Sequence, residues 1–83
     1  MEIIARTPKQ AGTALRRLRR QRGITQSDLG VKTNLRQATI SKLEAGEPNT
    51  QLRILMAALA ALDLELVIRP RSAAASDDIE DLF

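Results

Sequence analysis

The chain contains neither cysteine nor histidine, and its one aromatic residue is Phe83 at the C-terminus. Without cysteine it can form no disulfide and offers no thiolate to zinc or an iron–sulfur cluster. Without histidine it lacks the side chain that most often serves as a general acid or base and as a metal ligand. Its carboxylates are scattered and it has no phosphate loop, so we expect neither an enzyme nor a site for a metal or a cofactor.

The chain is also short, with 83 residues, and it has no apolar run of the roughly 18 residues that a membrane span needs. A single domain of this size buries only about 60% of its unfolded surface, so its core is marginal. With disulfides and metals excluded, association with a second copy is the remaining reinforcement. The N-terminus does not resemble a signal peptide, which predicts a cytoplasmic protein without a membrane partner.

Charge is unevenly divided along the sequence. Residues 1–71 contain all 13 lysines and arginines and six of the ten acidic residues, a net charge of +7. Residues 72–83 contain the other four acidic residues and no basic one. A basic body favours a polyanionic partner, and an acidic end indicates a separate role for that end. We therefore predict a folded basic domain at 1–71 and a disordered acidic tail at 72–83.

Apolar spacing and capping residues predict four helices in the basic body. Thr7 is the expected N-cap of the first helix, with Gln10 completing a capping box. Asn34 is the residue best able to adopt a left-handed conformation in the turn between the second and third helices. Asn49 or Thr50 is the expected cap of the fourth. The expected helices cover about residues 8–22, 26–32, 37–44 and 51–62.

After the fourth helix the apolar period changes to two, which predicts a β-strand over Leu64–Arg69 that Pro70 ends. In its own chain the only candidate partner is residues 2–4, so the simplest arrangement is pairing across the two-fold axis of a homodimer. The fourth helix is apolar on nearly all sides, and the part of its surface that the other helices do not cover is a second candidate dimer face. The predicted dimer-strand residues are Leu64, Leu66, Val67 and Ile68.

Two short helices joined by a four-residue turn form a helix-turn-helix. Residues 24–46 resemble the Cro/C1-type (XRE) repressor motif, most specifically in the Thr25-Gln26 pair and in the run Gln-x-Thr-Ile-Ser-Lys-x-Glu-x-Gly at 37–46. The resemblance implies a mainly α, four-helix lambda-repressor-like domain. Two positions depart from the family: Gly30 stands where Ala is usual, and Asn34 where Gly is usual.

The second helix of such a motif lies in the DNA major groove with its N-terminal residues toward the base edges. Gln can bond adenine, Arg or Lys can bond guanine, and Ala can contact a thymine methyl. The predicted base-contacting residues are Arg36, Gln37, Ala38, Thr39, Ser41 and Lys42. The predicted phosphate contacts are Thr25, Gln26 and Arg20. For any single one of these residues, a merely solvated position remains the alternative.

The family resemblance also implies that Arg19 pairs with Glu44, which would hold the recognition helix in place without reading DNA. The whole chain, with four helices, one strand and a short tail, is similar to the HipB-type antitoxins. That similarity implies a homodimer on a palindromic operator at the nucleoid, with half-sites about 34–36 Å apart, repression of its own operon, and a HipA-type serine/threonine kinase toxin as partner. The alternatives are a solitary repressor, a HigA-type antitoxin of a ribonuclease toxin, and a pure protein-inhibitor module.

The acidic tail contains the apolar residues Ile79, Leu82 and Phe83 among four carboxylates. One hypothesis is a peptide that folds on a partner and places these three side chains in a pocket. A solubilising tail, and a tail that shields the basic surface of the body, are the alternatives.

Overall fold

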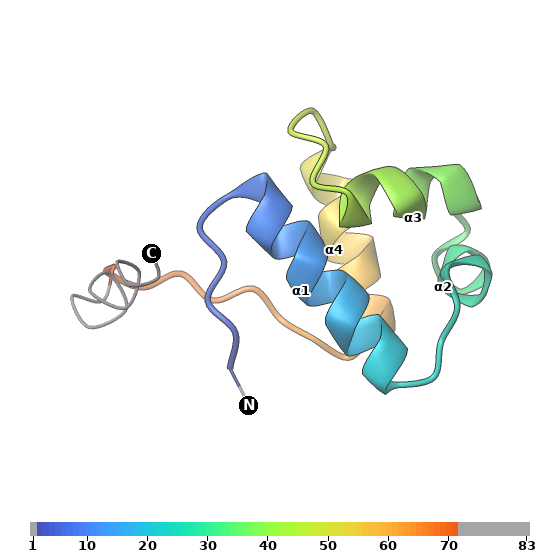
Figure 1. The fold of residues 1–83 in the computed structure, drawn as a ribbon, viewed down its shortest axis with the longest axis horizontal. Helices are drawn as coiled ribbons and strands as arrows, with labels where there is room; N and C mark the ends of the chain where they lie inside the picture. Colours follow the sequence, from blue (N-terminus) through green and yellow to red (C-terminus); the bar gives the residue numbers. More distant parts are fainter. Residues whose placement is uncertain (1, 72–83) are drawn as a thin grey trace.

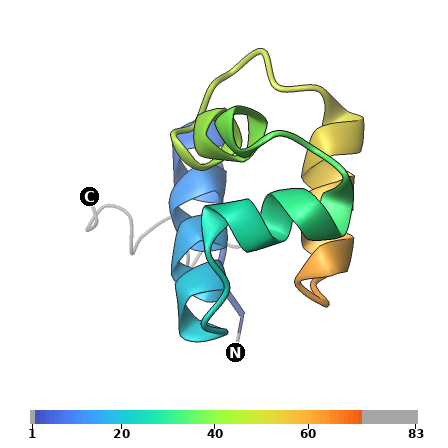
Figure 2. The same ribbon diagram turned by 90° about the vertical axis from the view of Figure 1, so that its right-hand side faces the viewer.

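The computed structural model describes residues 2–71, which form four helices (Figures 1 and 2). They are α1 Pro8–Gln21, α2 Gln26–Thr33, α3 Gln37–Glu44 and α4 Leu52–Ala61. The predicted four-helix architecture is confirmed, and the ends differ from the predicted ones by one or two residues at most. α2 packs against α3 and α4, and α3 also packs against α1 and α4. Between residues 2 and 71 no helix is long and apolar enough to cross a membrane.

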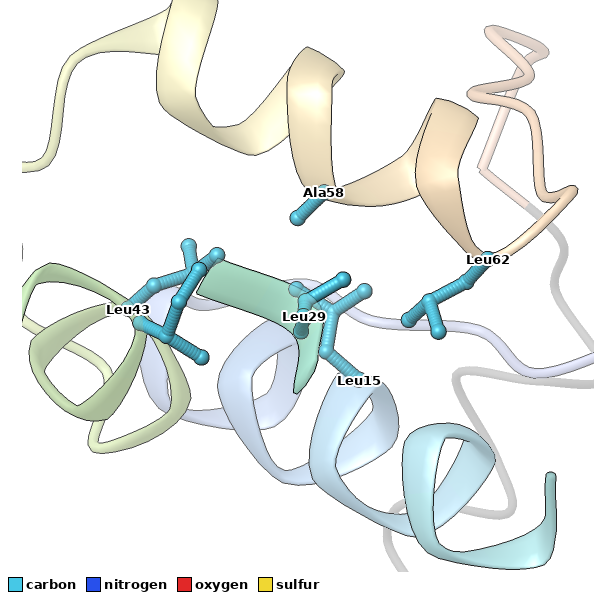
Figure 3. Close-up of a cluster of buried hydrophobic side chains, with 6 residues drawn as sticks. Leu15, Leu29, Leu43, Ala58 and Leu62 are labelled. Carbon is cyan, nitrogen blue, oxygen red and sulfur yellow. The ribbon is translucent and has the colours of Figure 1, made fainter. Parts of the chain in front are cut away.

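The core is aliphatic, as the shortage of aromatic residues requires. It contains six buried side chains, from all four helices and the residue after α4: Leu15, Leu29, Ile40, Leu43, Ala58 and Leu62. Figure 3 shows Ala58 and Leu62 facing Leu15, Leu29 and Leu43. The burial of these side chains supplies most of the free energy that orders the helices.

Two helix starts differ from the predicted caps. At α1 the Thr7 hydroxyl accepts from the Gln10 N–H (3.1 Å), as expected, but the Gln10 side chain accepts from the Arg6 N–H (2.7 Å) and not from that of Thr7. The predicted capping box is therefore wrong in its second bond. The N-cap of α4 is Gln51, whose side chain caps no backbone N–H and instead accepts from Arg53 Nε (2.9 Å). Thr50 does not cap, because its hydroxyl donates to a carbonyl of the preceding turn (2.8 Å).

The segment after α4 forms no strand within the described residues 2–71. A strand is defined by its pairing with another, and this single copy supplies no partner for Leu64–Arg69. Leu64 packs against the core, whereas Leu66, Val67 and Ile68 are exposed. Arg69 Nη1 donates to Glu2 Oε1 (3.2 Å), so the N-terminal arm lies beside this segment. Strand pairing across a dimer stays a prediction.

The acidic tail, with the predicted partner-binding residues Ile79, Leu82 and Phe83, lies outside the residues that the structure describes.

Candidate nucleic-acid interface

The α2–turn–α3 unit is held by local hydrogen bonds that its sequence specifies. Thr25 Oγ1 accepts from the Asp28 N–H, and Asp28 Oδ2 accepts from the Thr25 N–H, both at 3.0 Å, which completes a capping box at the start of α2. The bond from the Thr25 backbone is the main reason that the pKa of Asp28 is lowered. Asn34 ends α2 in the left-handed conformation (φ 59°, ψ 38°), as predicted.

Gly30 allows the turn to fold closely against α2. A Cβ at this position would lie 2.7 Å from the Leu35 carbonyl oxygen. The Leu35 N–H in turn donates to the Gly30 carbonyl at 2.9 Å. Glycine at this position therefore matches the close approach of the turn.

α3 separates an inner face from an outer face. Ile40 and Leu43 are buried, while the outer face contains Gln37, Ala38, Ser41 and Lys42, all exposed. At 100° per residue these four positions fall on one stripe of the helix. We call these four residues the outer stripe of α3. Arg36, the N-cap residue of α3, is also exposed, whereas Thr39 is half-buried and lies off the stripe.

The three predicted phosphate contacts differ in their surroundings. Arg20 and Thr25 are exposed, although the Thr25 oxygen already accepts the Asp28 N–H. Gln26 is half-buried and turned inward: its Nε2 donates to Glu44 Oε1 (3.1 Å), and its Oε1 accepts a long bond from Gln37 Nε2 (3.5 Å). The sequence did not reveal this second role of Gln26, because the partner Glu44 lies 18 residues away.

Arg19 and Glu44, the pair that the family resemblance implies, are joined in the structure. Arg19 Nε donates to Glu44 Oε2 (2.6 Å), and Arg19 Nη2 to Glu44 Oε1 (3.0 Å). Arg19 Nη1 donates to the Ile24 carbonyl (2.7 Å), so α1 is also tied to the loop before α2. Each of the two residues is only 6% exposed.

Burial alone would raise the pKa of Glu44. The hydrogen bonds from Arg19 and Gln26, together with the positive charges of Arg19 and Arg16, outweigh burial and leave the pKa below its usual value. The hydrogen bond to Glu44 likewise raises the pKa of Arg19. Both groups are therefore charged at neutral pH.

Ser27 is a candidate phosphate contact that the sequence prediction missed. It is exposed at the start of α2 and lies in a surface groove over the turn. Its place in the sequence, directly after Gln26 at the start of α2, could have indicated it. The groove is lined by Ser27, Gly30, Val31, Asn34, Leu35, Arg36 and Gln37.

Two short helices at this spacing, with the outer side of the second one exposed, define the helix-turn-helix class. The helix-turn-helix family model HTH_3 matches residues 15–68, and the chain belongs to that family. More particularly, it is 37% identical over 62 residues to the HipB antitoxins of Escherichia coli O6:H1 and Escherichia coli K12. The match covers 75% of this chain, and 66% and 70% of the two relatives.

The fold is also similar to solved HipB structures. A HipB–O4 20mer complex superposes with a TM-score of 0.79 at 33% identity, covering 83% of this chain and 97% of HipB. A HipA–HipB–O2–O3 complex gives a TM-score of 0.78, with the same identity and coverage.

Proposed function

We propose that this protein is a homodimeric, sequence-specific DNA-binding repressor that also serves as the antitoxin of a HipA-type serine/threonine kinase toxin. The observation that carries the proposal is the outer stripe of α3. Its amide, methyl, hydroxyl and ammonium groups are exposed together, and Arg36 stands at the start of the helix. These are the groups that read base edges in the major groove. In this role the protein is a binding module and not an enzyme.

The ion pair and the turn that hold the two ends of α3 support this role. A helix that reads bases must enter the groove at a fixed angle, because a bidentate contact tolerates little displacement. Here the C-terminal end of α3 is tied to α1 through Arg19 and Glu44, and its start is fixed by the tight turn at Asn34. The exposed Arg20, Thr25 and Ser27 flank this helix pair as phosphate contacts.

Exposed apolar side chains support the homodimer. Leu66 is 51% exposed, Ile68 90% and Leu52 65%, and a second copy would cover them. Residues 1–71 form the DNA-binding and dimerisation domain in this proposal, and residues 72–83 are a separate tail. Two recognition helices related by a two-fold axis read a palindromic operator with half-sites about 34–36 Å apart.

The kinase partner is taken from the relatives, since one similar structure is a complex of HipB with HipA. Bound to its operator at the nucleoid in the cytoplasm, the dimer excludes RNA polymerase and so represses its own operon. The same dimer holds the toxin, which links toxin release to transcription.

Operator binding is tested on duplexes selected from a random library, with affinity measured at several salt concentrations. Gln37→Ala is expected to cost about 1–3 kcal/mol at one base pair and to relax specificity there. Arg20→Ala is expected to weaken binding to all sequences equally and to reduce the salt slope, since a phosphate contact carries no sequence information. Arg71→Ala, which removes the same charge far from α3, is the control. A wild-type protein without a preferred sequence would contradict the proposal.

The antitoxin role is tested by co-purification of tagged protein from its host, with the full chain beside a chain that ends at Arg71. A serine/threonine kinase retained by the full chain supports the role. Its loss from the shorter chain would assign the contact to the tail, and its retention would assign it to the body. If neither chain retains a kinase, the protein is a repressor without this toxin.

A further inference from the structure

Gln26 connects the buried interior of the helix pair with the exposed start of α3. Its Nε2 is 3.1 Å from Glu44 Oε1, and its Oε1 is 3.5 Å from Gln37 Nε2. Glu44 is 6% exposed, Gln26 is half-buried, and Gln37 is exposed. The three side chains therefore form one path from the core to the outer stripe of α3.

Glu44, at the buried end of this path, determines which way the Gln26 amide faces. An amide can in principle face a neighbour with either its nitrogen or its oxygen, but an ionised carboxylate only accepts hydrogen bonds. Glu44 is held in place by two bonds from Arg19 and cannot turn away. The Gln26 amide must then present its nitrogen to Glu44, which leaves its oxygen facing Gln37.

The direction of the Gln26 amide also sets the direction of the Gln37 amide. With the Gln26 oxygen as its neighbour, Gln37 bonds through one hydrogen of its own nitrogen. The second hydrogen on Nε2 and the acceptor Oε1 remain for a ligand. This is the donor–acceptor pair that bonds N7 and N6–H of adenine in the major groove.

We propose that Glu44 is a positioning residue for base recognition, because it fixes the direction of the Gln26 amide and, through it, the donor and acceptor that Gln37 presents to an adenine. The proposal rests on the proposed DNA-binding function. It gives Glu44 a second task besides its ion pair with Arg19. Disturbing Glu44 should change which base is preferred, whereas a change at Arg19 that keeps a cation beside Glu44 should lower stability and leave the preferred base unchanged.

Three variants separate these tasks. Glu44→Gln weakens the ion pair and also allows the chain of amides to reverse, because glutamine offers both a donor and an acceptor. Arg19→Lys, the matched control, weakens the same pair but leaves an ionised Glu44 facing Gln26. Gln26→Met interrupts the path and keeps the ion pair, so it remains informative even if Glu44→Gln fails to fold.

The first readout is base preference in a duplex library randomised over the half-site. The position read by Gln37 is defined as the one whose preference disappears in Gln37→Ala. We expect at least a fivefold loss of preference at that position in Glu44→Gln and in Gln26→Met, and a change of less than twofold in Arg19→Lys. Retained preference in Gln26→Met, or an equal loss in Arg19→Lys, would overturn the proposal.

The second readout needs no DNA. In NMR spectra of the full chain, the Gln26 side-chain amide protons should exchange with water at least threefold more slowly in the wild type and in Arg19→Lys than in Glu44→Gln. Equal exchange in all three would overturn the link between Glu44 and Gln26. A wild-type protein with this NMR signature but without any base preference would instead contradict the proposed DNA-binding function.

Discussion

The two ends of the molecule differ in how far a single chain buries their apolar side chains and pairs their polar groups. On one side, α2 and α3 bury Leu29, Ile40 and Leu43, and polar groups bond to one another, as with Arg19, Gln26 and Glu44. On the other side, residues 2–6 and 65–71 form no helix (Figure 1), and Leu66 and Ile68 are exposed. The ion pair between Glu2 and Arg69 on this side is itself exposed.

The difference separates what a chain of this size can stabilise alone from what needs a second copy. An exposed ion pair contributes at most about 1 kcal/mol, whereas breaking a buried one costs several times more. The helix-turn-helix side is therefore expected to keep its shape in one protomer, and the other side to acquire its final structure in the dimer.

The largest effect is expected for Arg19→Ala on the helix-turn-helix side. It leaves the Glu44 carboxylate buried without its charged partner, and the free energy of unfolding should fall by about 3–5 kcal/mol. Urea unfolding at a fixed protein concentration measures it. Arg17→Ala, an exposed position on the same helix, is the control, and an equal loss in both variants would contradict the role of the pair.

Gly12→Ala tests the contact between α1 and the end of α3. A Cβ at this position would lie 2.5 Å from the Glu44 carbonyl oxygen and 2.6 Å from that of Leu43, and these backbone atoms can yield only if the helices separate. We expect a loss of about 1–3 kcal/mol in thermal or urea unfolding. Thr13→Ala, its exposed neighbour, should be nearly neutral; a neutral Gly12→Ala would show that the helices adjust at little cost.

Acid is expected to lower the free energy of unfolding, because protonation of Glu44 removes its ion pair with Arg19. Because its pKa is lower in the folded state than in the unfolded state, ionised Glu44 contributes stability that is complete above the usual glutamate pKa. That contribution is lost as the pH falls through the lowered folded-state pKa. The pH dependence of urea unfolding should therefore be shallower in Glu44→Gln, and an unchanged profile would assign the acid sensitivity to other carboxylates.

On the other side of the molecule, Leu66→Ser combined with Ile68→Ser should leave the fold of the protomer intact, since both side chains are exposed. The dimer should dissociate at least tenfold more readily, which corresponds to about 1.4 kcal/mol. Analytical ultracentrifugation measures this, with Glu65→Ser as the control in the same segment. A dimer of unchanged affinity would move the interface to another surface, such as α4.

The smallest effect is expected at the turn. Asn34→Gly relieves the contact of a Cβ in the left-handed conformation, and should stabilise the protein by up to about 1 kcal/mol in thermal unfolding. A destabilised variant would mean that the asparagine side chain contributes a bond which the conformation alone does not require.

The elements that the sequence predicted best are those with local causes. α3 has the predicted bounds, Asn34 has the predicted conformation, and the Thr7 hydroxyl caps α1 as predicted. Each depends on residues within four positions of one another. The missing cap of α4 shows the limit of this reasoning, because Thr50 found another acceptor nearby.

Long-range features needed the folded chain. Gln26 was predicted as a phosphate contact from its place at a helix start, and its bond to Glu44 depends on how α2 and α3 cross. Thr39 was predicted to read bases with its neighbours, but the packing of α3 leaves it half-buried beside the outer stripe. The alternating pattern at 64–69 predicted a strand, and the pattern cannot supply the second strand.

The sequence by itself determined the helices, their order, the aliphatic character of the core and the basic charge of residues 1–71, because periodicity, caps and charge are properties of neighbouring residues. The tertiary structure alone decided which side chains of α3 remain outside and that Gln26 lies between Glu44 and Gln37. It also decided how closely α1 approaches α3 at Gly12. These outcomes depend on the packing of residues far apart in the chain, where a shift of one ångström changes the partner of a hydrogen bond.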